Sequence, residues 1–445
     1  MTDTTRRHFI SGATLLPFAA ATAAQAATQS VTPAATADLA PLDIAEAQAD
    51  LRKYIGFGIK QAGGEGDNAC GDWMASELEK LGYVIEKQTM SAPYFTPERC
   101  ELVSGHTRAT VWPQPIVMPT GAQGVSGRLV RVDAAGHADA SLEGAIALVD
   151  LPFGRWSSML WKAVRTPIET AFKGGAAACI VVTNGPSGKV IALNTNGQKP
   201  MHKGPVALLA PEDAAPFFKA ALEGLVATLT MTGEGGRRPA FNFIARMNRS
   251  KSRWLVVSTP RSGWFTCAGE RGPGIAAWLS LARWARSNIT GYNLAFICNS
   301  GHEYEYLGAE EALHAIAPKP AETAFWLHLG ANIAARDWHD ILGKPMPLPG
   351  ADSQRFLVTS PSLIDTARAL FKGQVGLEAP YSSEQLSAGE LTNVIKAGYP
   401  LVAGVFGIHR YHHVSEDDER CVPADKVTEA TTAFRHLLEH ALLIS

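Results

Sequence analysis

A histidine and a glutamate stand side by side at His302 and Glu303, directly after the apolar run at residues 292–298. A run of this kind predicts a buried strand, and the loop that follows can bring both side chains into one cleft. An imidazole can move protons near neutral pH, and a carboxylate can bind a metal ion. A polar cap at the end of the strand is the alternative. Whether the pair belongs to a functional site or is only a polar cap depends on which other residues lie near it.

The order of predicted elements shows where such companions could lie. Strands are expected at residues 254–258, 294–298, 323–329 and 401–406, and helices at residues 274–286, 309–316, 362–371 and 424–443. Strands and helices in strict alternation predict an α/β fold with a mostly parallel central sheet flanked by helices. Ligands on such sheets bind beyond the carboxyl ends of the strands.

Further carboxylates and imidazoles fall at that edge of the predicted sheet. Glu270 follows the first strand and its loop, and His328 lies near the end of the third strand. His409, His412 and His413 follow the last strand. Two carboxylates and one imidazole from separate loops can hold a catalytic zinc and leave one coordination position open. Each residue alone could be a loop charge or a core histidine, but their convergence favours a site.

Three motifs of the C-terminal half carry a family resemblance. The first is Asn-Phe-Ile-Ala at residues 242–245, where the family has Asn-x-Ile-Ala. The second runs from Phe296 to Ala309 and has Gly-His-Glu at residues 301–303, where the family has Gly-Glu-Glu. The third is Tyr-His-His-Val-Ser-Glu at residues 411–416, where the family has Tyr-His-Thr-x-x-Asp. With them, residues 241–445 resemble the catalytic domain of zinc aminopeptidases such as aminopeptidase Y and bacterial leucyl aminopeptidases. Glutaminyl cyclases and the transferrin receptor are relatives of that family. The resemblance implies a zinc-exopeptidase-like α/β fold.

The resemblance also assigns metal ligands. It places the family's bridging aspartate on Glu270, a ligand glutamate on Glu303 and the final ligand histidine on His412. The ligands private to the second zinc are missing, because the His-x-Asp pair falls on residues 259–261 and the later aspartate falls on Gly330. The resemblance therefore implies one zinc per chain. His328, His413 and Glu390 are possible additional ligands.

Other site roles follow from the same comparison. His302 stands where the family has its catalytic glutamate, so it could act as the base or as a fourth metal ligand. Arg261 stands where a ligand aspartate is expected, and it could bind a substrate carboxylate or replace the missing cation. The expected walls of the substrate pocket, which could instead be core residues, are Trp264, Tyr304 and Trp326.

The remaining chain predicts further parts. Residues 43–110 read as the N-terminal part of the peptidase-like domain, with helices at 43–60 and 71–82. Residues 111–240 contain short apolar strands bounded by Gly and Pro, which predicts a small inserted α/β or β module. That module resembles a protease-associated domain. Residues 241–445 form the catalytic, peptidase-like domain.

The N-terminus has the form of an export signal. Arg6 and Arg7 precede an uncharged stretch that ends in the small-x-small sequence Ala-Gln-Ala at residues 24–26. This pattern predicts a twin-arginine signal peptide at residues 1–26, followed by a linker at residues 27–42. The mature protein is therefore expected in the periplasm or outside the cell, with no membrane association after signal cleavage.

Composition excludes several classes of partner. The 445 residues carry a formal net charge of −2 without a long basic run, so no nucleic-acid or polybasic membrane surface is expected. The six cysteines contain no Cys-x-x-Cys pair, which argues against a thiolate zinc site. Cys70 and Cys100 are the disulfide pairing nearest in sequence. A small peptide-like or amide substrate fits this composition better.

Two functions of different class remain open at this point. The first is an exported metallopeptidase-like hydrolase or acyl-transfer enzyme that acts on a small amide with a single zinc. The second is a catalytically silent binding protein with a peptidase fold. The lost ligands favour the second, whereas the surviving set of Glu270, Glu303 and His412 favours the first.

Overall fold

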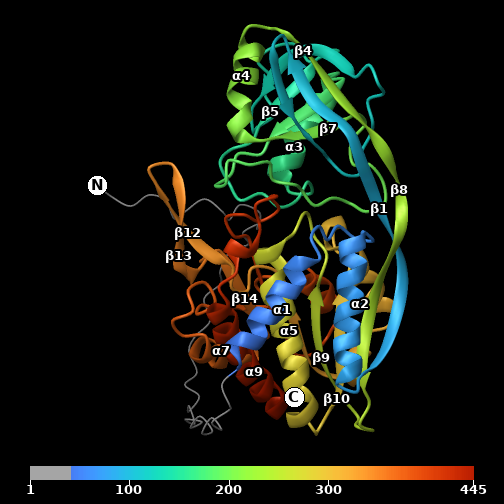
Figure 1. The fold of residues 1–445 in the computed structure, drawn as a ribbon, viewed down its shortest axis with the longest axis vertical. Helices are drawn as coiled ribbons and strands as arrows, with labels where there is room; N and C mark the ends of the chain where they lie inside the picture. The colour runs from blue at the N-terminus through green and yellow to red at the C-terminus, as the bar shows by residue number, and fades with distance from the viewer. Residues whose placement is uncertain (1–41) are drawn as a thin grey trace, which may run out of the picture. The chain divides into compact units, whose positions relative to one another are not determined.

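The computed structural model describes residues 42–445 (Figure 1). Its central strands are β16 (Val402–Gly407), β11 (Thr323–Leu329), β9 (Trp254–Pro260) and β10 (Asn293–Asn299), which lie side by side in this order. Every neighbouring pair among them is parallel. The predicted α/β fold with a mostly parallel central sheet is therefore confirmed. The predicted export signal and residues 27–41 of the predicted linker lie outside the described residues.

Helices cover both faces of this sheet. One face packs against α1 (Ile44–Gly56), α2 (Glu65–Lys80), α5 (Ala268–Asn288), α7 (Ile364–Leu370) and α9 (Ala424–Ile444). The other face packs against α6 (Leu307–Ala315) and α8 (Leu391–Lys396). Successive residues of a strand point to opposite faces, so Leu255 and Val257 lie in the first core and Val256 in the second. Burial on both faces explains why these strands are continuous apolar runs.

Two long antiparallel strands leave the sheet together. Figure 1 shows β1 (Val84–Ser104) and β8 (Val226–Met247) running side by side, and they pair from Val84–Arg246 to Val103–Thr228. One end of β8 pairs with β10, and its other end pairs with β4 (Val125–Val132). At 21 residues, β1 is much longer than a usual strand of about 5–6 residues.

We call residues 105–225, between these two strands, the inserted segment. Its parallel strands are β4, β5 (Ile146–Asp150), β6 (Ala178–Val182) and β7 (Val206–Leu209). Helices α3 (Lys162–Lys173) and α4 (Pro211–Leu222) pack on opposite faces of these strands. The short strands β2 (Thr107–Thr110) and β3 (Trp112–Pro113) complete it. Residues 226–240, expected to belong to the inserted module, are part of the continuous strand β8.

The remaining strands lie near the C-terminal part of the sheet. β14 (Arg355–Thr359) and β15 (Tyr381–Ser382) extend the sheet beyond β16, and β12 (Arg336–Ile341) and β13 (Lys344–Ala351) form a separate hairpin. Among residues 42–445, no helix combines the length and apolar composition that a membrane span requires. All six cysteines have free thiols in the structure.

Gly308 tests how tightly the start of α6 packs on the loop after β10. A Cβ atom at Gly308 would lie 1.9 Å from the carbonyl oxygen of Ser300. We expect Gly308→Ala to lower the free energy of unfolding by about 1–3 kcal/mol, measured by chemical denaturation. Gly291→Ala is the control, because a Cβ there meets nothing within 4 Å. Equal stability of the two variants would contradict this packing.

Candidate active site

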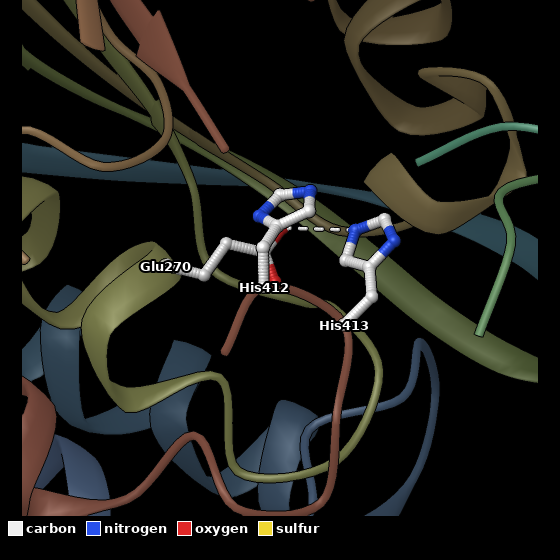
Figure 2. A group of neighbouring side chains, drawn as sticks. All are labelled: Glu270, His412 and His413. Atoms are coloured by element: carbon white, nitrogen blue, oxygen red, sulfur yellow. Dashed lines mark ion pairs between the residues drawn. The ribbon is translucent and has the colours of Figure 1, made fainter. Parts of the chain in front are cut away.

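Three buried side chains with metal-ligand atoms meet at one point (Figure 2). Glu270 lies in the first turn of α5, and His412 and His413 lie in the loop after β16. Glu270 Oε1 lies 3.3 Å from His413 Nε2 and 4.0 Å from His412 Nδ1. The structure therefore brings together two expected ligands, Glu270 and His412, and adds His413, which was a possible one.

The tautomer of His413 supports a cation at this point. Its Nδ1–H donates a hydrogen bond of 2.9 Å to the carbonyl oxygen of Ala192. In a neutral ring, Nε2 then presents a lone pair to the Glu270 carboxylate, and the two repel unless a cation lies between them. Zinc bonds of about 2.0–2.1 Å place tetrahedral ligand atoms roughly 3.3 Å apart. A backbone carbonyl on the other ring nitrogen is also the usual support of a metal-binding histidine.

Unpaired polar atoms give a second, independent indication. Within residues 42–445, both carboxylate oxygens of Glu270 and Nδ1 of His412 are buried and have no aligned hydrogen-bond partner. Leaving such a group unpaired costs about 1–3 kcal/mol. One metal ion would satisfy all three atoms, so these residues fit a metal. His412 Nε2 lies 3.3 Å from the hydroxyl of Ser157.

Arg271 is a cation already present beside this group, and the sequence did not single it out. It is fully buried, its Nη2 lies 2.7 Å from Glu270 Oε1, and its Nε donates to the carbonyl oxygen of Ser262. Burial raises the pKa of Glu270, whereas the adjacent Arg271 guanidinium lowers it, and the pKa lies well below its ordinary value. Glu270 is therefore ionised, and a metal would share it with Arg271.

Asp417 connects the loop of the two histidines to the turn that carries Glu270. Its carboxylate accepts hydrogen bonds from the backbone N–H of Gly269 at 2.6 Å and of Glu270 at 3.0 Å. It thus caps α5 from a distant part of the chain. His409 Nε2 lies 3.3 Å from the same carboxylate, and Cys421 is near enough to complete a second possible ligand group. The oxygens of Asp417 are already used by the helix.

Glu303 turns away from this group. Its carboxylate accepts hydrogen bonds from the Ala62 N–H at 2.6 Å and the Ser262 hydroxyl at 2.8 Å. It is not among the ligand atoms gathered around Glu270. Burial raises the pKa of the Glu303 carboxyl to about 7. The structure therefore separates Glu303 from the two residues expected to share a metal with it.

His302 meets a different partner from its neighbour. Its Nδ1 lies 3.1 Å from a carboxylate oxygen of Glu390, and its ring packs edge-on against Tyr306. Burial lowers the pKa of His302, and Arg271 lowers it further, while Glu390 opposes both. A neutral imidazole held by a carboxylate has the form of a general base. Glu390 thus contacts His302 and is not part of the group around Glu270.

Arg261 is buried as the counter-ion of another carboxylate. Its Nε lies 3.0 Å from Asp67 Oδ1, and both side chains are fully buried. Its Nη2 donates to the carbonyl oxygen of Phe241, and the guanidinium stacks on the Phe241 ring at 4.5 Å. This placement favours the second expected role, in which Arg261 stands in for a missing cation.

The expected pocket residues fall into two places. The rings of Trp264 and Tyr304 are in contact, and Trp264 Nε1 donates to Asn194 at 2.9 Å. Trp326 instead packs on Tyr399, on the sheet face covered by α6 and α8. His328 lies on the same face, where burial lowers its pKa to about 4.

Backbone strain is concentrated near these residues. The non-glycine residues with positive φ include Phe265, Cys267, Glu305, Tyr306 and His413. Such conformations cost about 1–3 kcal/mol each and are typical of functional sites.

The inserted segment closes over the site. Besides the contacts of Ser157 and Ala192 with the two histidines, the N–H of Thr195 donates to the carbonyl oxygen of Glu303 at 3.1 Å. Arg155 pairs with Asp352 at 2.7 Å. These contacts join parts of the chain that are more than 100 residues apart, which periodicity in the sequence cannot detect.

Three solved structures resemble the chain over most of its length. BSAP, a zinc aminopeptidase from Bacillus subtilis, is 16% identical with a TM-score of 0.69, and the match covers 90% of this chain and 95% of that chain. A peptidase M28 precursor from Shewanella amazonensis is 16% identical with a TM-score of 0.66, over 90% and 95%. An aminopeptidase from Aneurinibacillus is 16% identical with a TM-score of 0.61, over 88% and 93%.

No protein-family model matches the sequence, and no curated protein matches it. The evidence for a shared architecture therefore comes from the solved structures alone. The expected resemblance to zinc aminopeptidases is confirmed at the level of the fold: this chain has a zinc-aminopeptidase-like fold.

Proposed function

We propose that this protein is an exported, metal-dependent hydrolase or acyl-transfer enzyme that acts on a small amide or peptide-like substrate. The proposed ligands of its single zinc ion are Glu270, His412 and His413, with His413 in place of Glu303. The observation that carries the proposal is the cluster of buried ligand atoms on Glu270, His412 and His413, in which Nδ1 of His412 has no hydrogen-bond partner among the described residues. The fold of the solved zinc aminopeptidases supports the same class of reaction.

The chain's own residues divide the chemistry between them. A zinc ion, when bound, polarises a carbonyl oxygen or acidifies a water molecule. His302, held by Glu390, accepts the proton of the attacking water or amine at Nε2. Nη1 of Arg271 is buried and has no hydrogen-bond partner among the described residues, so it can donate to negative charge that develops on the carbonyl oxygen.

The enclosed site supports a small substrate. Contacts from the inserted segment cover both histidines, so a long peptide would need this segment to move. The charge balance supports neither a nucleic-acid nor a membrane partner, and the N-terminal sequence supports export.

A binding protein without catalysis is the second candidate. The specific observation in its favour is that two buried arginines already pair with carboxylates near the site. Arg271 pairs with Glu270, and Arg261 pairs with Asp67. The two guanidinium groups could thus supply the positive charge that the two zinc ions supply in the family that the sequence resembles.

Metal content separates the two candidates and tests the ligand set. We expect about one zinc per chain by elemental analysis, because the three ligand atoms are buried and lie close together. His412→Ala and His413→Ala should each lose most of the metal, whereas Glu303→Gln should keep it. Metal-free protein of unchanged stability would rule out the enzyme. Loss of zinc in Glu303→Gln but not in His413→Ala would restore the ligand set expected from the sequence.

Glu303 should give stability a measurable pH dependence. Its pKa rises from an ordinary value of 4.5 to about 7 in the folded protein, so folding favours the protonated form. This contribution is fully present below pH 4.5 and is lost as pH rises through about 7, a change of about 3 kcal/mol. As pH rises through this range, the unfolding free energy of wild type, measured by chemical denaturation, should fall by this amount relative to that of Glu303→Gln. A constant difference would mean that Glu303 is ionised throughout.

Arg261 should matter for stability and not for metal binding. We expect Arg261→Met to lose about 3–5 kcal/mol of unfolding free energy, because it leaves Asp67 buried and unpaired. Lys87→Met is the control, since the exposed pair of Lys87 with Asp72 should contribute only about 0–1 kcal/mol. A stable Arg261→Met protein that has lost substrate binding would instead support contact with substrate.

A further inference from the structure

A buried polar network contacts Nδ1 of His302. Glu390 accepts at both carboxylate oxygens: one lies 3.1 Å from His302 Nδ1, and the other accepts from the Asn299 amide at 3.1 Å. All three residues are more than nine-tenths buried. The ring nitrogen that faces Glu390 must carry the proton, so Nε2 of a neutral His302 is left with its lone pair.

A second group of polar residues faces the first. The Trp326 indole donates to the Ser258 hydroxyl at 2.8 Å, because an indole N–H can only donate. The hydroxyl proton of Ser258 is therefore available to His328 Nδ1, which lies 2.9 Å away. His328 then carries its own proton on Nε2.

A small cavity separates the two groups. Its volume is about 10 Å³, which is close to the space that one water molecule needs. Its polar lining comes from both groups: Ser258, Asn299, Trp326, His328, Glu390 and Asn393. The amide oxygen of Asn299 is buried and has no hydrogen-bond partner among the described residues. A water molecule in this cavity could donate to that oxygen.

We infer that this cavity holds one ordered water, bound by Asn299 and His328, and that the network positions His302 for proton transfer. Glu390 is the positioning residue in contact with His302. The side-chain amide of Asn299 holds Glu390 in place, and the water links Asn299 to His328. The network keeps His302 in the Nδ1–H tautomer, which leaves the Nε2 lone pair able to accept a proton. The use of that tautomer as a base rests on the proposed function; the water and the tautomer do not.

The water is tested directly on the wild-type protein. A high-resolution crystal structure should show one water within hydrogen-bond distance of both Asn299 Oδ1 and His328 Nε2. An empty cavity, or a water that contacts neither atom, would overturn the inference. This measurement does not depend on any variant folding.

The tautomer is tested by NMR of protein labelled with ¹⁵N-histidine, with the His302 signals assigned from their loss in His302→Gln. Wild type should show the Nδ1–H form at neutral pH. Glu390→Gln should keep this form, because its amide oxygen can still accept, whereas Glu390→Leu should shift His302 towards the Nε2–H form. Glu310→Leu, at an exposed position on α6, is the matched control and should change nothing.

The outcomes separate this inference from the proposed function. An Nε2–H tautomer in wild type would overturn the inference even if zinc is bound. An Nδ1–H tautomer in protein that binds no zinc would support the inference and contradict the proposed function. If Glu390→Leu does not fold, the wild-type tautomer and the wild-type crystal structure still decide.

Discussion

The capping of α5 by Asp417 is the interaction on which the site depends. A helix N-terminus leaves backbone N–H groups without partners, and here a carboxylate from the C-terminal loop accepts two of them. The same contact brings His412 and His413 to Glu270, which lies in the first turn of that helix. Gly269 leaves room for it, since a Cβ there would lie 2.9 Å from the Asp417 carboxylate. The contacts that cap α5 are therefore the same contacts that hold the histidine loop beside Glu270.

The site balances two sources of positive charge around one carboxylate. Glu270 is shared between Arg271 and the place where a metal fits. Arg271 stabilises the ionised carboxylate without metal, which favours folding of the metal-free chain. The same charge weakens the binding of a metal by repulsion. This balance explains how one structure can support both an enzyme with a single zinc and a binding protein without one.

Sequence patterns predicted the fold well where burial is uniform. β11 occupies the residues expected from its apolar run, 323–329. The middle of β1 and β8 was missed, because Pro93, Pro97 and the glycines near residue 235 remove the alternation that marks a strand. In the site, Glu270 and His412 were found because their loops follow strands of one sheet. The direction in which the Glu303 side chain points could not be predicted, because it is set by a hydrogen bond from Ala62, 241 residues away. Ala192, the partner of His413, is equally remote, at 221 residues.

The most direct test of the central claim is anomalous diffraction at the zinc absorption edge, from crystals of protein purified without added chelator. The account predicts a single anomalous peak bounded by Glu270 Oε1, His412 Nδ1 and His413 Nε2, with Glu303 still bound to Ala62 and Ser262. Absence of a peak, with Arg271 alone paired to Glu270, would contradict the proposed metal centre. A peak that includes Glu303, or a second peak beside Asp67, would contradict the ligand assignment.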